Sequence, residues 1–114
     1  MFYGAITALI TPFRNGQLDE KVTFMSSELE SIVMTICAGR LREMEIPISF
    51  IYAKDYKFYS NKAQICQVLV NLINNSIDAI ENLEEKFIEV HIREDEHKHF
   101  IDVIDSGNGI PSEI

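Results

Sequence analysis

Hydrophobic residues along the chain follow two long helical patterns, separated by shorter runs of alternation. From about Leu18 to Met44, apolar residues recur every three or four positions, which predicts an amphipathic helix. A second such stripe runs from Asn61 to about Leu83. Asn61 is a good N-cap for this helix, with Gln64 as its capping-box partner. Each helix has one apolar face and therefore needs a sheet or another helix to cover it.

Shorter runs around these helices predict strands. The predicted strands cover residues 4–12, 46–52, 58–59, 88–93 and 100–105. We expect residues 54–57 to form a hairpin connection and residues 94–98 to form a charged hairpin tip. The order of strand, helix, hairpin, helix and hairpin predicts an α+β fold, a two-layer sandwich of helices over a mixed or antiparallel sheet.

A polar stripe runs along the second helix. At about 100° per residue, Asn71, Asn75 and Asp78 lie within a narrow arc, and Gln67 extends it by one turn. Asparagine is a poor helix former, so its repetition here carries a small cost that a ligand site would explain. Amide oxygens suit magnesium. A solvated helix face explains the stripe about as well.

A carboxylate and a glycine turn follow the last predicted strand. Asp105 ends that strand, and a carboxylate there can accept a hydrogen bond from an exocyclic amine such as that of adenine. Gly107 and Gly109 would let the backbone approach a flat ring, and Ile110 would add apolar surface beside it. A plain turn has the same composition.

Together, the runs Gln67–Ser76 and Asp105–Ile110 resemble the N box and first glycine box of the ATP-binding domain of sensor histidine kinases. The resemblance covers roughly residues 25–114 and implies the histidine-kinase-type ATPase fold. It implies that Asn75 binds magnesium, Asn71 helps to place phosphate and Asp105 selects adenine. It also implies that Gly107 and Gly109 shape the base pocket, and we count Asp78 and Ile110 among the nucleotide-binding residues.

The chain also departs from that family. Hydrolytic relatives carry a glutamate base where this chain has Asn71, and a neutral amide cannot accept a proton from water, which favours the kinase branch. The phosphoacceptor histidine is not found, because His91, His97 and His99 fall on strands or a hairpin tip. The lid and the later glycine box are not found either. We therefore expect a truncated ATP-binding domain without kinase activity, in which binding of ATP or ADP with magnesium is weak or lost.

The first twenty residues carry a different resemblance. Phe2–Phe13 and Asn15–Glu20 are similar to the opening of dihydrodipicolinate synthase, a Schiff-base-forming barrel aldolase. This similarity divides the chain into an aldolase-like segment, 1–22, and a partial kinase domain, 23–114, and implies a chimera. The added strand would cover a sheet edge that is otherwise open.

Length, composition and charge limit the kind of protein and the partners that the chain can have. With 114 residues and 46% hydrophobic content, the chain suits one small domain. Its net charge of −8 disfavours nucleic acid and anionic membranes, and no apolar run approaches the ~18–20 residues of a membrane span. Cys37 and Cys66 are expected to be free thiols, which favours a cytoplasmic protein. The alternative is a chimeric structural module without a ligand, forming a homodimer through a sheet edge or helix stripe.

Overall fold

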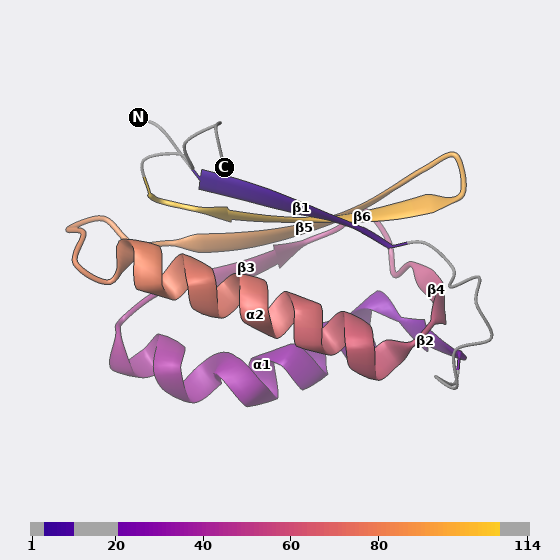
Figure 1. Cartoon of the computed structure of the whole chain (residues 1–114), viewed down its shortest axis with the longest axis horizontal. Helices are drawn as coiled ribbons and strands as arrows, with labels where there is room; N and C mark the ends of the chain where they lie inside the picture. The colour runs from indigo at the N-terminus through magenta and orange to yellow at the C-terminus, as the bar shows by residue number, and fades with distance from the viewer. Residues whose placement is uncertain (1–3, 11–20, 108–114) are drawn as a thin grey trace.

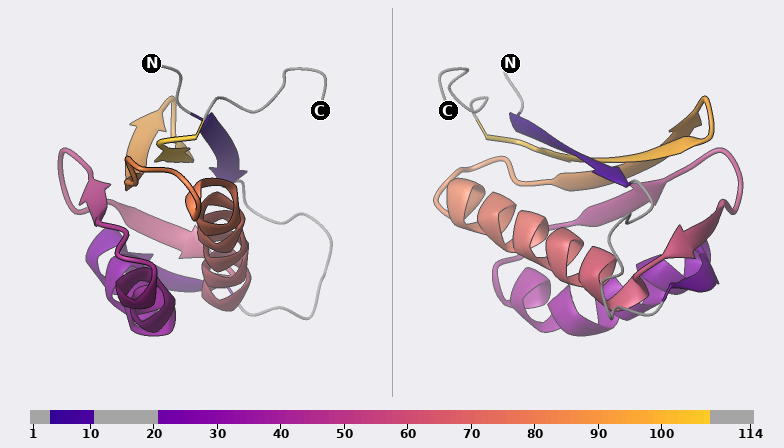
Figure 2. Two further views of the ribbon diagram at one scale, coloured as in Figure 1. Left: turned by 90° about the vertical axis from the view of Figure 1, so that its left-hand side faces the viewer. Right: turned by 45° about the vertical axis from the view of Figure 1, so that its right-hand side comes forward.

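The computed structural model describes residues 4–10 and 21–107, whose helices and strands form two layers (Figure 1). Helices α1 and α2 lie on the same side of a four-stranded sheet, and a two-stranded sheet lies near their N-terminal ends (Figure 2). This arrangement confirms the predicted α+β class. The elements are β1 Gly4–Ile10, β2 Val22–Met25, α1 Ser26–Glu43, β3 Ile48–Ile51, β4 Lys57–Ser60, α2 Lys62–Ile80, β5 Ile88–Asp95 and β6 Lys98–Asp105.

The larger sheet is mixed and has the strand order β1-β6-β5-β3. Strand β3 is parallel to β5, whereas β5 with β6 and β6 with β1 are antiparallel. The predicted hairpin of β5 and β6 turns through Glu96 and His97, whose φ angles are 49° and 70°. Positive φ at both positions of a two-residue turn is the backbone of type I′, which matches the twist of the flanking strands.

One part of the core lies between α2 and the two central strands, β5 and β6. Fully buried side chains come from one face of α2 and from alternate positions of β5 and β6: Ile73, Ile77, Ile80, Val90, Ile101 and Val103. Because side chains alternate along a strand, Asp105 lies on the same face of β6 as Ile101 and Val103. Among the described residues, no helix combines the length and apolarity that crossing a membrane requires.

The start of the first helix differs from the prediction. Helix α1 begins at Ser26, because Val22–Met25 form strand β2, which the sequence analysis missed. Asp55 caps this helix: its two carboxylate oxygens accept from the amide of Ser27 at 2.9 Å and from its hydroxyl at 2.7 Å. The cap comes from a loop remote in sequence, so the local pattern could not reveal it. The predicted helical residues 18–20 lie outside the described residues.

The hairpin predicted around residues 54–57 is wrong. Strand β3 pairs with β5 in the larger sheet, while β4 pairs with β2 in the smaller one. Phe24 of β2 stacks on Phe58 of β4 with ring centroids 5.1 Å apart, which favours that pairing. The predicted boundary between residues 22 and 23 falls within β2, and this division of the chain stays a prediction.

Candidate functional site

The polar stripe of α2 lies opposite its buried face. Asn71 and Asn75 are exposed, whereas Ile73 and Ile77 are fully buried on the other side of the helix. The predicted cap is confirmed, because the side-chain oxygen of Asn61 accepts from the Gln64 amide at 2.9 Å. The helix therefore presents the amide side chains of Asn71 and Asn75 to solvent, where a ligand can reach them.

Asp105 is a buried carboxylate at the end of β6. Its residue exposure is 6%, and its Oδ1 atom accepts a hydrogen bond from the Gly107 amide at 2.8 Å. Burying a charged group is costly unless hydrogen bonds compensate it. This carboxylate is thus held in one orientation by the chain that immediately follows it.

Gly107 has no room for a side chain. A Cβ atom at this position would lie 2.8 Å from Asp105 Oδ1 and 3.5 Å from Ile80 Cγ2. The contact with Ile80 shows that the end of α2 and the end of β6 converge at this glycine. The glycine turn therefore lies beside the C-terminal end of the helix that carries the first motif. Gly109 and Ile110 lie outside the described residues.

Ser106 fastens the beginning of the turn to β5. Its amide donates to the Phe87 carbonyl at 3.2 Å, and its hydroxyl accepts from the Phe87 amide at 3.1 Å. The residue is 7% exposed. Sequence analysis did not single out this serine, because a serine within a glycine turn is common and its partner comes from another strand.

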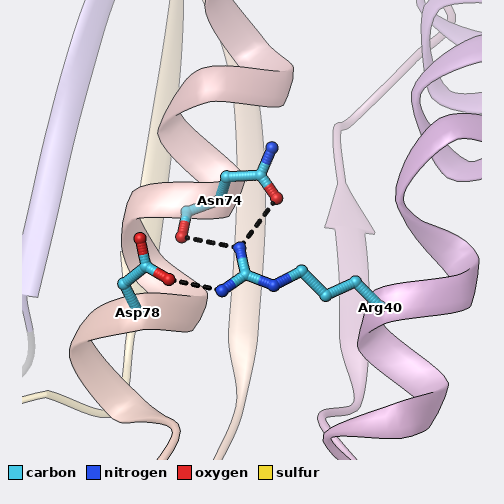
Figure 3. A network of polar contacts seen from close by, with 3 residues as sticks. All are labelled: Arg40, Asn74 and Asp78. Carbon is cyan, nitrogen blue, oxygen red and sulfur yellow. Dashed lines mark hydrogen bonds and ion pairs between the residues drawn. The ribbon is translucent and has the colours of Figure 1, made fainter.

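Asp78 lies on the border of the stripe that faces α1. Its carboxylate pairs with the Arg40 guanidinium, which also donates to the Asn74 side-chain oxygen at 3.1 Å and to the Asn74 carbonyl at 3.4 Å (Figure 3). The structure thus gives Asp78 a partner between the helices. Its predicted contact with a nucleotide stays a prediction. Arg40 escaped the sequence analysis, because no local pattern links residues on two helices.

The described residues form no cluster of three or more acidic, histidine or cysteine side chains that could bind a metal ion. Magnesium commonly keeps several waters and shares phosphate oxygens with its ligand. A magnesium ion at Asn75 would accordingly depend on a bound phosphate, which fits the exposed position of this amide.

Comparison with known proteins points to one family. Residues 60–114 match the family described as histidine kinase-, DNA gyrase B- and HSP90-like ATPase. The putative sensor histidine kinase NtrY-like protein of Rickettsia felis is 37% identical over 93 residues, which are 80% of this chain. The chain spans 16% of the length of that relative.

The solved structures that resemble this chain are also histidine kinases. The catalytic domain of histidine kinase ThkA superposes with a TM-score of 0.74 at 30% identity, over 82% of this chain and 64% of that domain. The cytoplasmic segment of histidine kinase QseC superposes with a TM-score of 0.58 at 8% identity, over 77% of this chain and 79% of that segment, which shows the shared fold alone.

The findings do not support the aldolase resemblance of residues 1–22 or the chimera inferred from it. In the structure, residues 4–10 form strand β1 of the same sheet that carries the kinase-like motif. The shared fold and the sequence matches support a truncated ATPase domain of the sensor histidine kinase type.

Proposed function

We propose that the chain binds an adenine nucleotide together with magnesium. The observation that carries this proposal is the Asp105 carboxylate, buried at the end of β6 with one oxygen held by the Gly107 amide. A carboxylate oriented in this way can accept a hydrogen bond from the exocyclic amine of adenine. By resemblance, Gly109 and Ile110 would belong to the same base pocket.

The phosphates would meet the exposed face of α2. Asn75 would bind magnesium through its amide oxygen, and Asn71 would lie one turn away toward the phosphates. A neutral amide and a shared ion hold phosphate less strongly than a ring of cationic donors would. We therefore expect weak binding that depends on magnesium.

Phosphotransfer by this chain itself is not part of the proposal. Asn71 cannot act as a general base. His91 is engaged by Glu89 at 2.8 Å, and the His99 ring packs against Phe58 with centroids 4.5 Å apart. These contacts favour a structural role for both histidines in the β5–β6 hairpin.

The wider role is inferred from the relatives. Histidine kinase ThkA has been solved in complex with response regulator protein TrrA, and this chain superposes on ThkA there with a TM-score of 0.72 at 29% identity, over 82% of this chain and 28% of ThkA. We infer that the chain acts in two-component signalling, in the cytoplasm where ATP and reduced thiols are available. The alternative of a structural module without a ligand is not favoured by these matches.

The test is isothermal titration of the whole chain with magnesium-ADP, using Asn75→Ala and Asp105→Asn. Asp105→Asn keeps the shape of the side chain and removes a charged acceptor, so we expect affinity to fall by about tenfold or more. Gln67→Ala is the matched control, because Gln67 is also exposed on the stripe of α2 but lies two turns before Asn75.

Binding by the native chain that both site variants weaken, and that Gln67→Ala leaves intact, would support the proposal. A folded native chain that produces no heat with magnesium-ADP would contradict it. In that case the mass in solution should be measured at several concentrations, because self-association would then favour the structural alternative.

A further inference from the structure

The backbone of β6 offers its hydrogen-bonding groups alternately to its two neighbours. Ser106 donates to the Phe87 carbonyl of the segment leading into β5, and Asp105 lies opposite Ile88 in the register of the two strands. In an antiparallel pair, every second residue exchanges both bonds with its partner. The backbone groups of Asp105 therefore point away from β5, as do those of Val103 and Ile101.

Strand β1 pairs with the edge of β6 that faces away from β5. Its register with β6 runs from Gly4 opposite Asp105 to Ile10 opposite His99, so it reaches the last residue of β6 (Figure 1). The alternation makes Gly4 and Asp105 a hydrogen-bonded pair. The amides of Gly4 and Ala8 consequently point to β6, and those of Ala5 and Thr7 point away from it.

Asp105 therefore lies between two strands at the end of the sheet: its own backbone faces β1, and the next residue, Ser106, bonds to the segment before β5. Ile88 lies opposite Asp105 on β5, and Gly4 pairs with its backbone on β1. Its carboxylate is buried and bound to the Gly107 amide, where no space is left for a Cβ atom. A shift of the Asp105 backbone would consequently move the carboxylate and the glycine turn together.

We propose that β1 is a positioning element of the nucleotide site, which fixes the Asp105 carboxylate by pairing with the outer edge of β6. This inference rests on the proposed function and adds to it a segment that is remote from the site motifs in sequence. An edge strand left without a partner exposes its backbone groups to water and to other chains. Loss of β1 would thus loosen the adenine-reading end of β6 while the core packing between α2 and the central strands remained.

The test compares two neighbouring proline substitutions in the whole chain, Gly4→Pro and Ala5→Pro. Gly4→Pro removes the amide that pairs with Asp105, at the first residue of an edge strand, where proline is tolerated. Ala5→Pro places the same ring one residue later, at an amide that points away from β6. We expect Gly4→Pro to weaken magnesium-ADP binding by roughly fivefold, and Ala5→Pro to leave it within roughly twofold of the native chain.

A second pair, Ala8→Pro and Thr7→Pro, tests the strand with a readout that needs no nucleotide. We expect Ala8→Pro, unlike Thr7→Pro, to accelerate hydrogen exchange at the outward amides of β6, those of Ile101, Val103 and Asp105. Circular dichroism identifies the variants that remain folded.

Faster exchange in Ala8→Pro or Gly4→Pro, together with weaker binding, would support the inference. Faster exchange with unchanged magnesium-ADP affinity would overturn it and leave the proposed function standing. Identical exchange in both members of each pair would also overturn it, because β1 would then not hold the edge of β6. A native chain that does not bind magnesium-ADP would refute the proposed function, which the titration detects independently of the exchange measurement.

Discussion

The Arg40 guanidinium on α1 pairs with the Asp78 carboxylate on α2, and it also binds the side chain and the carbonyl of Asn74 (Figure 3). Three acceptors on the last turns of α2 thus converge on one cation. The Asp78 side chain is 64% exposed and that of Arg40 is 35% exposed, so solvent screens the charge pair. The network connects the two helices close to the exposed amides Asn71 and Asn75.

We expect Asp78→Ala to lower the free energy of unfolding by about 0.5–1 kcal/mol, because exposed ion pairs contribute little. Magnesium-ADP affinity should change by less than about threefold if Asp78 serves only the helix contact. Urea unfolding at low and high salt measures the first quantity, and titration measures the second. Lys62→Met is the matched control, since Lys62 joins Glu28 across the same two helices at 3.3 Å. A large loss of binding in Asp78→Ala alone would instead assign this carboxylate to the nucleotide site.

Local signals explain what the sequence could predict of the fold. Helix α2 was predicted closely, because its cap at Asn61 and its apolar stripe lie within one segment. Strand β2 was missed, because Val22–Met25 merge with the helical spacing that follows, and its partner β4 is remote in sequence. The wrong hairpin followed from that omission. Strand pairing across long separations is a tertiary property that periodicity does not record.

The candidate site shows the same difference between local and long-range signals. Asp105 and Gly107 could be proposed as site residues because strand, carboxylate and glycine are adjacent in sequence, and their contact in the structure is also local. Arg40 and Ser106 were not found, since their partners Asp78 and Phe87 lie on other elements. Residues whose contacts come from another element are thus harder to predict from one sequence than residues of a contiguous motif.

Gly107→Ala should damage the site directly. The new Cβ atom would meet Asp105 Oδ1 at 2.8 Å, so the carboxylate must move and its hydrogen bond to the Gly107 amide must lengthen. We expect magnesium-ADP affinity to fall by about tenfold or more and the free energy of unfolding to fall by about 1–3 kcal/mol. Titration and urea unfolding measure the two effects.

Gly39→Ala is the control for Gly107→Ala. Gly39 lies within α1, and a Cβ atom there meets nothing within 4 Å. Alanine in a helix is favoured over glycine, so this variant should gain about 0.5–1 kcal/mol and bind magnesium-ADP as the native chain does. Equal affinity of the native chain and both glycine variants would show that the turn at Gly107 does not shape the binding site.

The two cysteines should resist alkylation while the chain is folded. Cys37 is 3% exposed and Cys66 is 7% exposed, and burial raises the pKa of both thiols, which reduces the reactive thiolate. We expect iodoacetamide at mildly alkaline pH to modify both residues slowly in buffer and rapidly in denaturant. Mass spectrometry follows the reaction. Rapid modification in buffer would mean that α1 and α2 separate readily, contrary to their tight packing.

Tyr52 gives a prediction for alkaline pH. Its hydroxyl donates to Glu30 Oε1 at 2.7 Å, and this hydrogen bond, with smaller effects of burial and of the Glu30 and Asp55 charges, raises its pKa from 10.0 to about 12. The folded state therefore holds the phenol proton more tightly than the unfolded state does. The stabilisation is complete below pH 10.0 and is lost as pH rises toward about 12, because only the unfolded chain releases the proton in that interval.

Tyr52→Phe isolates this effect, because it removes the hydroxyl and keeps the ring. Near neutral pH we expect the variant to be less stable than the native chain by about 1 kcal/mol, the usual contribution of one hydrogen bond. The difference should shrink as pH rises from 10.0 to about 12. Urea unfolding across this interval measures it, and Glu30→Gln should bring the tyrosine titration back toward the ordinary range, because the charged acceptor is gone. A difference between native chain and Tyr52→Phe that stays constant over the whole interval would mean that Glu30 does not control this phenol.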